Sequence, residues 1–138
     1  MSDCIFCKIV NGDIPAYKIY EDDDVLAFLD ITQATKGHTL IIPKKHVENI
    51  YALDDKTSQA VFSKIPTVAN AIKESLNPIG LNLLQNNDQP LQSVFHFHVH
   101  LIPRYQEDET TIGWVNHQDS YQDADYKHVQ TEIKKCIK

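Results

Sequence analysis

The sequence is poor in cysteine and has no long apolar run. Its 138 residues include only three cysteines, an odd and small set that suggests no disulfide framework. No run approaches the ~20 apolar residues of a membrane span, and the start, Met1-Ser2-Asp3-Cys4, does not resemble a signal peptide. We therefore expect a protein of a reducing, cytoplasmic compartment that has no membrane partner.

Positive charge is also scarce. The 13 lysines and arginines are outnumbered by 19 acidic residues, and the net charge is −6. The sequence has no basic stripe that could bind nucleic acid and release its counterions, so nucleic acid is not an expected partner. A local pocket could still bind a small anion. The content of 42% hydrophobic and 23% charged residues is typical of a soluble globular protein. The length suits one domain spanning residues 1–138.

Histidines stand at every second position in the stretch 93–103, as His96, His98 and His100. The residues around them are largely β-branched or aromatic, so we expect a strand. Successive side chains of a strand point to opposite faces, and the three histidines would therefore share one face. The other face would carry Phe97, Val99 and Leu101.

Two interpretations of these histidines are open. One is a half-buried strand whose imidazoles are solvated or satisfied by neighbours, which would be natural for a single histidine. Three on one face instead favour metal ligation, or nucleophilic and acid–base chemistry, because imidazole is the usual group for these roles near neutral pH.

Other segments predict the rest of the fold. Short apolar runs indicate strands at 17–20, 25–29, 37–43 and 81–84, and the run at 81–84 should pair antiparallel with the histidine strand. The fold class is then α+β: an antiparallel five-stranded sheet with a long helix packed on it and a C-terminal helix.

Two helices follow from apolar spacing. Between Lys56 and Leu76 the apolar positions form a helical stripe, which Asp54 or Asp55 could cap and Asn77-Pro78 would end. Pro66 lies inside this stripe and should kink or split the helix. The C-terminal helix is indicated by helical spacing in the last segment, at Val129, Ile133 and Ile137.

Cys4 and Cys7 form a Cys-x-x-Cys motif that could be a redox pair or half of a zinc site. The redox form normally follows a strand, yet only three residues precede Cys4. A zinc site needs two more ligands, for which His46 and His96 are candidates. The alternative is two buried thiols beside an apolar helical turn.

The histidines can also perform phosphoryl chemistry. A neutral imidazole is a competent nucleophile when its other nitrogen holds the proton. Attack on phosphorus would yield a histidine–phosphate intermediate that water then opens. Ser93 lies near the start of the stretch and could hydrogen-bond a phosphate or leaving group. Acyl transfer is the rival chemistry, but no Cys or Ser elbow motif accompanies the histidines.

The pattern His-φ-His-φ-His-φ-φ, where φ is apolar, resembles the signature of the histidine triad (HIT) family. Within that family the chain most resembles the bacterial branch that hydrolyses nucleoside phosphoramidates. Further motifs follow in the family's order at 4–9, 12–15, 27–31, 37–46 and 92–94. The resemblance covers about residues 4–105, and the tail 106–138 diverges.

The resemblance implies a role for each matching residue. His98 matches the nucleophile, with its second nitrogen held by the carbonyl of His96. His100 and Ser93 match residues that contact the phosphate and leaving group, and His38 matches the fourth histidine of the catalytic pocket. Asp30 matches the carboxylate that binds both ribose hydroxyls. The matches for other nucleotide contacts are Ile5, Phe6, Ile9 and Phe28 around a purine, with Asn86 (or Asn87), Gln92 and His96.

The resemblance also implies a cofactor. Cys4, Cys7, His46 and His96 match the zinc ligands of the metal-containing members. Four protein ligands leave no position for water, so this zinc would be structural. No organic cofactor is expected.

The phosphate loop departs from the family pattern. Asp88 and Leu91 stand where relatives have glycines that allow a positive φ or close approach of the backbone to a ligand. This departure could reshape the loop and change the preferred leaving group.

We therefore expect a hydrolase that cleaves purine nucleoside 5′-phosphoramidates through a nucleotidyl-histidine. The alternatives are a dinucleoside polyphosphate hydrolase of the same family and a nucleotide-binding or scaffolding module with incidental activity. The resemblance further implies a homodimer with one ten-stranded sheet. Trp114 would then either approach the partner's leaving-group site or serve packing alone.

Overall fold

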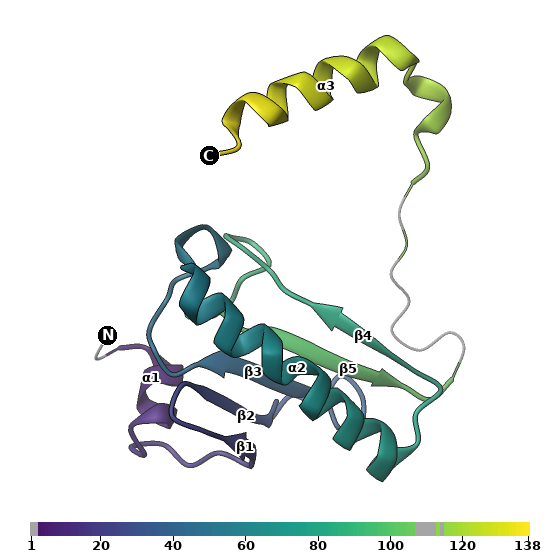
Figure 1. Cartoon of the computed structure of the whole chain (residues 1–138). Coiled ribbons are helices and arrows are strands. Elements are labelled where there is room, and N and C mark those ends of the chain that lie inside the picture. The colour runs from purple at the N-terminus through teal and green to yellow at the C-terminus, as the bar shows by residue number, and fades with distance from the viewer. Residues whose placement is uncertain (1–2, 107–112, 114) are drawn as a thin grey trace.

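The computed structural model describes residues 3–106, 113 and 115–138, and it contains one five-stranded antiparallel sheet (Figure 1). The strand order is β1-β2-β3-β5-β4. The strands are β1 Lys18–Glu21, β2 Val25–Leu29, β3 Thr39–Pro43, β4 Gly80–Leu84 and β5 Val99–Arg104. The helices are α1 Ile5–Val10, α2 Asp55–Leu76 and α3 Asp123–Cys136, with short 3₁₀ turns η1 Ile50–Ala52 and η2 Gln118–Ser120. The predicted fold class is confirmed.

Both faces of the sheet are buried. Because successive side chains of a strand point to opposite faces, a strand residue packs on the side of either α1 or α2. On one face Ala27, Ile41 and Val99 pack with the apolar stripe of α2. On the other face Phe28 and Leu40 pack with α1. Because both faces are covered, β2 and β3 are apolar at nearly every position, which explains their continuous runs in the sequence.

The long helix α2 runs without a break for 22 residues, so Pro66 does not split it. Its amino end is capped by the Asp54 side chain, which accepts from the Thr57 N–H, and Asn77 ends it in the left-handed conformation. The buried stripe is the predicted one: Val61, Ile65, Val68 and Ile72. Burying four such side chains contributes about 1.5–3 kcal/mol each, which outweighs the ~3 kcal/mol cost of an interior proline.

The histidine strand is shorter than predicted, since β5 begins at Val99 rather than near Ser93. Continuing the register beyond Ile41 and Val99 would pair Ile42 with His98 and then Pro43 with Phe97. Pro43 has no N–H to donate, its carbonyl accepts from the His96 ring at 2.7 Å, and the Phe97 N–H donates to Val47 at 2.6 Å. His96 and His98 therefore precede the sheet, although Phe97 still enters the core beneath α2.

The C-terminal helix α3 is present as predicted, and each of its residues is exposed to solvent. Figure 1 shows it apart from the sheet. Its apolar residues Val129 and Ile133 are 53% and 59% exposed. Trp114 lies outside the described residues. Among the helices that the structure describes, none is long and apolar enough to cross a membrane.

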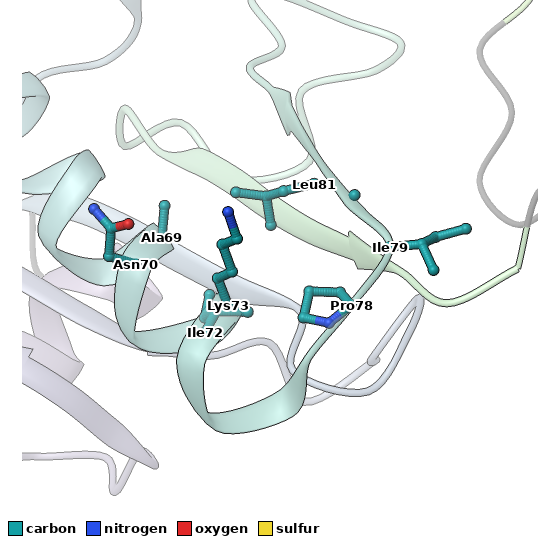
Figure 2. A pocket seen from close by; sticks show the side chains of 8 residues that line it. Ala69, Asn70, Ile72, Lys73, Pro78, Ile79 and Leu81 are labelled. Carbon is teal, nitrogen blue, oxygen red and sulfur yellow. The ribbon is translucent and has the colours of Figure 1, made fainter.

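A second apolar feature is a groove between the end of α2 and the start of β4 (Figure 2). It is lined by Ala69, Asn70, Ile72, Lys73, Pro78, Ile79, Gly80 and Leu81. The groove adjoins β4, which has a neighbour on only one side and therefore forms an edge of the sheet. Leu83 on this edge strand is 49% exposed.

We predict that Gly37→Ala destabilises the protein more than Gly12→Ala. Both glycines have positive φ, 94° and 83°, which costs a non-glycine residue roughly 1–2 kcal/mol. At Gly37 the added methyl would also lie 2.5 Å from Leu76 Cδ1, whereas at Gly12 nothing lies within 4 Å. Urea denaturation measures both free energies of unfolding, and equal losses would contradict the steric contribution at Gly37.

Candidate active site

Four imidazoles gather near α1, on the face of the sheet opposite α2. His100 lies on β5 and pairs with Leu40, which belongs to the α1-side core. His38 directly precedes β3, and His96 and His98 lie in the segment that leads into β5. The ring centroids of His98 and His100 are 5.1 Å apart, as are those of His38 and His100. The structure thus brings together histidines that are 62 residues apart in the chain.

His98 is held in one tautomer by the backbone. Its Nδ1 lies 2.7 Å from the His96 carbonyl oxygen, which can only accept, so Nδ1 carries the proton. The other nitrogen, Nε2, then has a free lone pair. Burial lowers the pKa of His98 below its usual value near 6.5, although the hydrogen bond to His96 opposes this shift. At neutral pH the ring is uncharged and able to act as a nucleophile.

His38 and His100 form a second chain with a defined direction. The Ala34 N–H donates to His38 Nδ1 at 3.0 Å, so the His38 proton must be on Nε2. His38 Nε2 lies 2.9 Å from His100 Nδ1 and donates to it. His100 Nδ1 is thus an acceptor, and the His100 proton is on Nε2. Burial, with smaller contributions from His98 and His38, lowers the pKa of His100 to about 4 and keeps it neutral.

An apolar pocket opens beside the histidines between α1 and β2. It is lined by Ile5, Ile9, Ile14, Pro15, Ala16, Tyr17, Phe28, Leu29, Asp30, Ile31 and Leu40. Three of the four predicted wall residues are in this lining. The fourth, Phe6, is buried behind it with its ring 5.1 Å from that of His98. Sequence reasoning missed Tyr17, which is exposed and belongs to no motif, and Ile31, which is exposed at the end of the 27–31 motif.

Asp30 is the acidic residue of this pocket. One carboxylate oxygen accepts from the Thr32 N–H and hydroxyl at 2.8 and 2.6 Å. The other oxygen lies 3.5 Å from His38 Nε2. Burial works against ionisation, but the hydrogen bonds from Thr32 and the nearby imidazoles outweigh it and lower the pKa of Asp30. The carboxylate is therefore ionised and has one oxygen available.

The loop between β4 and β5 is shaped by internal hydrogen bonds. Gln92 is buried. Its Oε1 accepts from the Asp88 N–H, and its Nε2 donates to the Glu48 and Val94 carbonyls, so both polar atoms of the side chain already have partners. Asn87 accepts from the Ile50 N–H. Asp88 adopts a positive φ of 65°. Leu91 and Ser93 are exposed, and Asn86 is half-buried.

Cys4, Cys7, His46 and His96 converge, with their ligand atoms all within 4.8 Å of one another. Cys7 Sγ lies 3.3 Å from His46 Nδ1, and Cys4 Sγ lies 3.5 Å from His96 Nδ1. Ligands of a tetrahedral zinc ion are separated by roughly 3.3–3.8 Å. His96 donates its other ring N–H to the Pro43 carbonyl, as a metal-ligating histidine does. The donor set fits a tetrahedral metal ion.

A second trio, Asp30, His38 and His100, also has ligand atoms within 4.8 Å of one another, but it does not fit a metal. A metal on His38 Nε2 would require a proton on Nδ1. That nitrogen instead accepts from the Ala34 N–H. Hydrogen bonding therefore distinguishes the two clusters, and only the cysteine-containing one is prepared for a metal ion.

The chain is similar to a known protein family and to several named proteins. The HIT domain family model matches residues 11–107. The chain is 50% identical over 137 residues to Protein hit of Bacillus subtilis, covering 98% of this chain and 94% of that protein. It is 39% identical to the adenosine 5′-monophosphoramidase hnt1 of Schizosaccharomyces pombe, with 98% of both chains covered. It is 42% identical to the adenylylsulfatase HINT3 of Arabidopsis thaliana, covering 78% of this chain and 55% of that protein.

Solved structures agree with these relatives. A crystal structure of a HIT family protein from Bacillus anthracis matches with a TM-score of 0.95 at 49% identity, covering 99% of this chain and 98% of that one. A zinc-bound histidine triad family protein from Mycobacterium smegmatis matches with a TM-score of 0.75 at 32% identity, covering 99% of both. The sequence match and the shared fold together show that this chain belongs to the HIT domain family.

Proposed function

We propose that the protein hydrolyses purine nucleoside 5′-phosphoramidates through a covalent nucleotidyl intermediate on His98. The observation that carries the proposal is the hydrogen bond from His98 Nδ1 to the His96 carbonyl, which leaves Nε2 as an unprotonated nucleophile. Relatives named adenosine 5′-monophosphoramidase and adenylylsulfatase support a reaction at the α-phosphorus of an adenosine nucleotide.

In the first step His98 Nε2 attacks phosphorus and forms an N–P bond. The bond from phosphorus to the leaving amine breaks, and the amine departs with the electron pair and takes a proton from solvent water. The positive charge that develops on His98 is stabilised because Nδ1–H still donates to the His96 carbonyl. The intermediate is a nucleotidyl-histidine with a labile P–N bond.

Water that has given a proton to the amine is left as hydroxide. In the second step this hydroxide attacks the same phosphorus. The N–P bond to His98 breaks, the nucleoside monophosphate leaves, and the imidazole returns to its neutral form. His100 presents its Nε2–H to this region and can donate to a phosphate oxygen in both steps. Ser93 offers a further hydroxyl near the leaving group.

Nucleotide binding is assigned to the apolar pocket beside the histidines. A purine would pack against its walls, among them Ile5 and Phe28. The free oxygen of Asp30 would accept hydrogen bonds from the ribose hydroxyls. Asn86 is the candidate phosphate contact of the loop, whereas the amide of Gln92 is committed to shaping that loop.

The alternatives differ in leaving group or in the need for turnover. A dinucleoside polyphosphate hydrolase would use the same nucleophile with a phosphate leaving group. A binding or scaffolding module would need no unprotonated His98. A substrate panel tests all three: adenosine phosphoramidate, adenylyl sulfate and diadenosine polyphosphate. Fastest turnover of the phosphoramidate is expected, and absence of turnover on every substrate would contradict an enzymatic function.

We also propose that Cys4, Cys7, His46 and His96 hold a structural zinc ion. When bound, the ion would cross-link α1, the segment after β3 and the histidine segment, and it would supply no catalytic chemistry because all four positions are protein ligands. In the metal-free site, burial with the neighbouring Cys4 raises the pKa of Cys7 to about 11. Metal binding would therefore release a proton.

A homodimer is the expected assembly. The edge strand β4 has a neighbouring strand on one side only, and its apolar Leu83 is exposed. The adjoining groove and the exposed apolar residues of α3 provide further surface for a second copy. A two-fold axis beside β4 would extend the sheet to ten strands.

The nucleophile is tested by His98→Asn. This variant should bind nucleoside monophosphate with near wild-type affinity but lose turnover by roughly 10⁴-fold or more, because asparagine can hydrogen-bond phosphate yet cannot form the covalent intermediate. Calorimetry measures binding and a steady-state assay measures turnover. Wild-type turnover in this variant would contradict the mechanism.

The sugar contact is tested by Asp30→Asn. The substitution should weaken binding of a ribonucleotide more than that of the 2′-deoxynucleotide, since only the ribose offers both hydroxyls to a carboxylate. Titration calorimetry with the two nucleoside monophosphates measures the ratio of dissociation constants. Equal losses for both ligands would remove the sugar role of Asp30.

The metal is tested by Cys4→Ser, with Cys136→Ser as the matched control on exposed α3. The first variant should lose bound zinc and melt at least about 5 °C lower, because metal affinity at such a site is folding free energy. The control should keep both properties. The metal proposal fails if elemental analysis finds no zinc in the wild type and the two variants melt alike.

The assembly is tested by sedimentation at micromolar concentration. The expected mass is near twice 15.8 kDa. Leu83→Lys should shift the protein towards the monomer, while Ile50→Lys, at a residue of similar exposure on η1, should not. A wild-type mass of one chain would contradict the homodimer.

A further inference from the structure

The loop between β2 and β3, residues 30–38, is clamped by the side-chain amide of Gln33. Its Nε2 donates to the Asp30 carbonyl at 2.6 Å and to the His38 carbonyl at 2.7 Å. Its Oε1 accepts from the Gly37 N–H at 2.8 Å. One amide therefore joins the end of β2 to the residues that lead into β3.

The clamp closes the loop over the ring of His38. With both ends of the loop held, the Ala34 N–H points at His38 Nδ1 from 3.0 Å. This contact makes His38 Nδ1 an acceptor and directs the Nε2–H toward His100 Nδ1. The orientation of the Gln33 amide is unambiguous, because the reverse orientation would set its oxygen against two carbonyl oxygens.

We propose that Gln33 is a positioning residue that fixes the tautomers of His38 and His100. Through the clamp, Ala34 and His38, it holds the proton of His100 on Nε2, where it can donate to a substrate phosphate oxygen. The kinetic part of this inference depends on the proposed function, whereas the tautomer part depends only on the hydrogen bonds of the loop.

The chemistry of the three partners explains why an amide is needed. The Asp30 and His38 carbonyls each accept one backbone N–H and take a second hydrogen bond from the amide, and the Gly37 N–H requires an acceptor. A carboxylate at position 33 could serve only the Gly37 N–H and would repel both carbonyl oxygens. Asparagine has the same groups but is one methylene shorter. Gln33 is exposed and contributes nothing to the apolar core, so its replacement should leave the fold intact.

The test compares Gln33→Met with the wild type by long-range ¹H–¹⁵N NMR of the imidazole rings. In the wild type, His38 and His100 should each show an unprotonated Nδ1 and a protonated Nε2. In the variant both rings should show averaged nitrogen shifts, because Ala34 no longer selects one tautomer. With adenosine phosphoramidate as substrate, kcat should fall roughly tenfold or more with KM changed less than about twofold.

Two further variants separate positioning from general stability. Thr35→Val removes a different hydrogen bond of the same loop, the one from Thr35 Oγ1 to the Pro103 carbonyl, and should keep the wild-type ring signals and kcat. Gln33→Glu should behave like Gln33→Met. Wild-type ring tautomers in both Gln33 variants would overturn the proposal, as would the same kcat loss in Thr35→Val. If the wild type lacks phosphoramidase activity, the NMR comparison still decides the tautomer inference.

Discussion

The site depends on hydrogen bonds that imidazole rings donate to backbone carbonyl groups. The His96 carbonyl fixes the proton of His98, and the Pro43 carbonyl fixes that of His96. A tautomer that is set by the backbone needs no reorganisation when charge develops on the ring. Burial adds to this by lowering the pKa of His98, so the ring of the proposed nucleophile is uncharged at neutral pH.

These carbonyl groups are available because the histidine segment joins the sheet only at Val99. A strand that continued back to Ser93 would involve the backbone of Phe97 and Pro43 in ladder hydrogen bonds. Proline cannot donate to such a ladder, and Phe97 pairs with Val47 instead. His96 then connects the two clusters: its ring faces the cysteines, and its carbonyl holds His98. A structural metal at His96 would stiffen the segment whose carbonyl holds His98.

Much of this architecture could be predicted from local patterns. The alternation around Phe97 and Val99, the stripe on α2 and a cap at Asp54 or Asp55 each depend on neighbours in sequence, and the structure confirms them, with Asp54 as the cap. Other features depend on contacts between distant segments, and no local signal exists for them. The late start of β5 depends on the missing N–H of Pro43, and the continuity of α2 depends on core packing that outweighs Pro66.

The site shows the same division between local pattern and distant contacts. Spacing and the family resemblance indicated the histidines and cysteines as site residues, and the structure places them together. Resemblance could not show that Gln92 is committed to the loop or that Phe6 lies behind the pocket lining. Nor could it show that His38 is unsuited to a metal, because that conclusion depends on the direction of one backbone N–H at Ala34.

The most direct test of the central claim is to trap the intermediate. Wild-type enzyme mixed with excess adenosine phosphoramidate, quenched in alkali within milliseconds and digested for mass spectrometry, should yield one peptide bearing an adenylyl group on His98. The group should disappear after substrate is exhausted and should be lost from the peptide on mild acid treatment, as a P–N bond is. Turnover at the normal rate with no adenylylated histidine at any quench time, or with the group on another residue, would contradict the account.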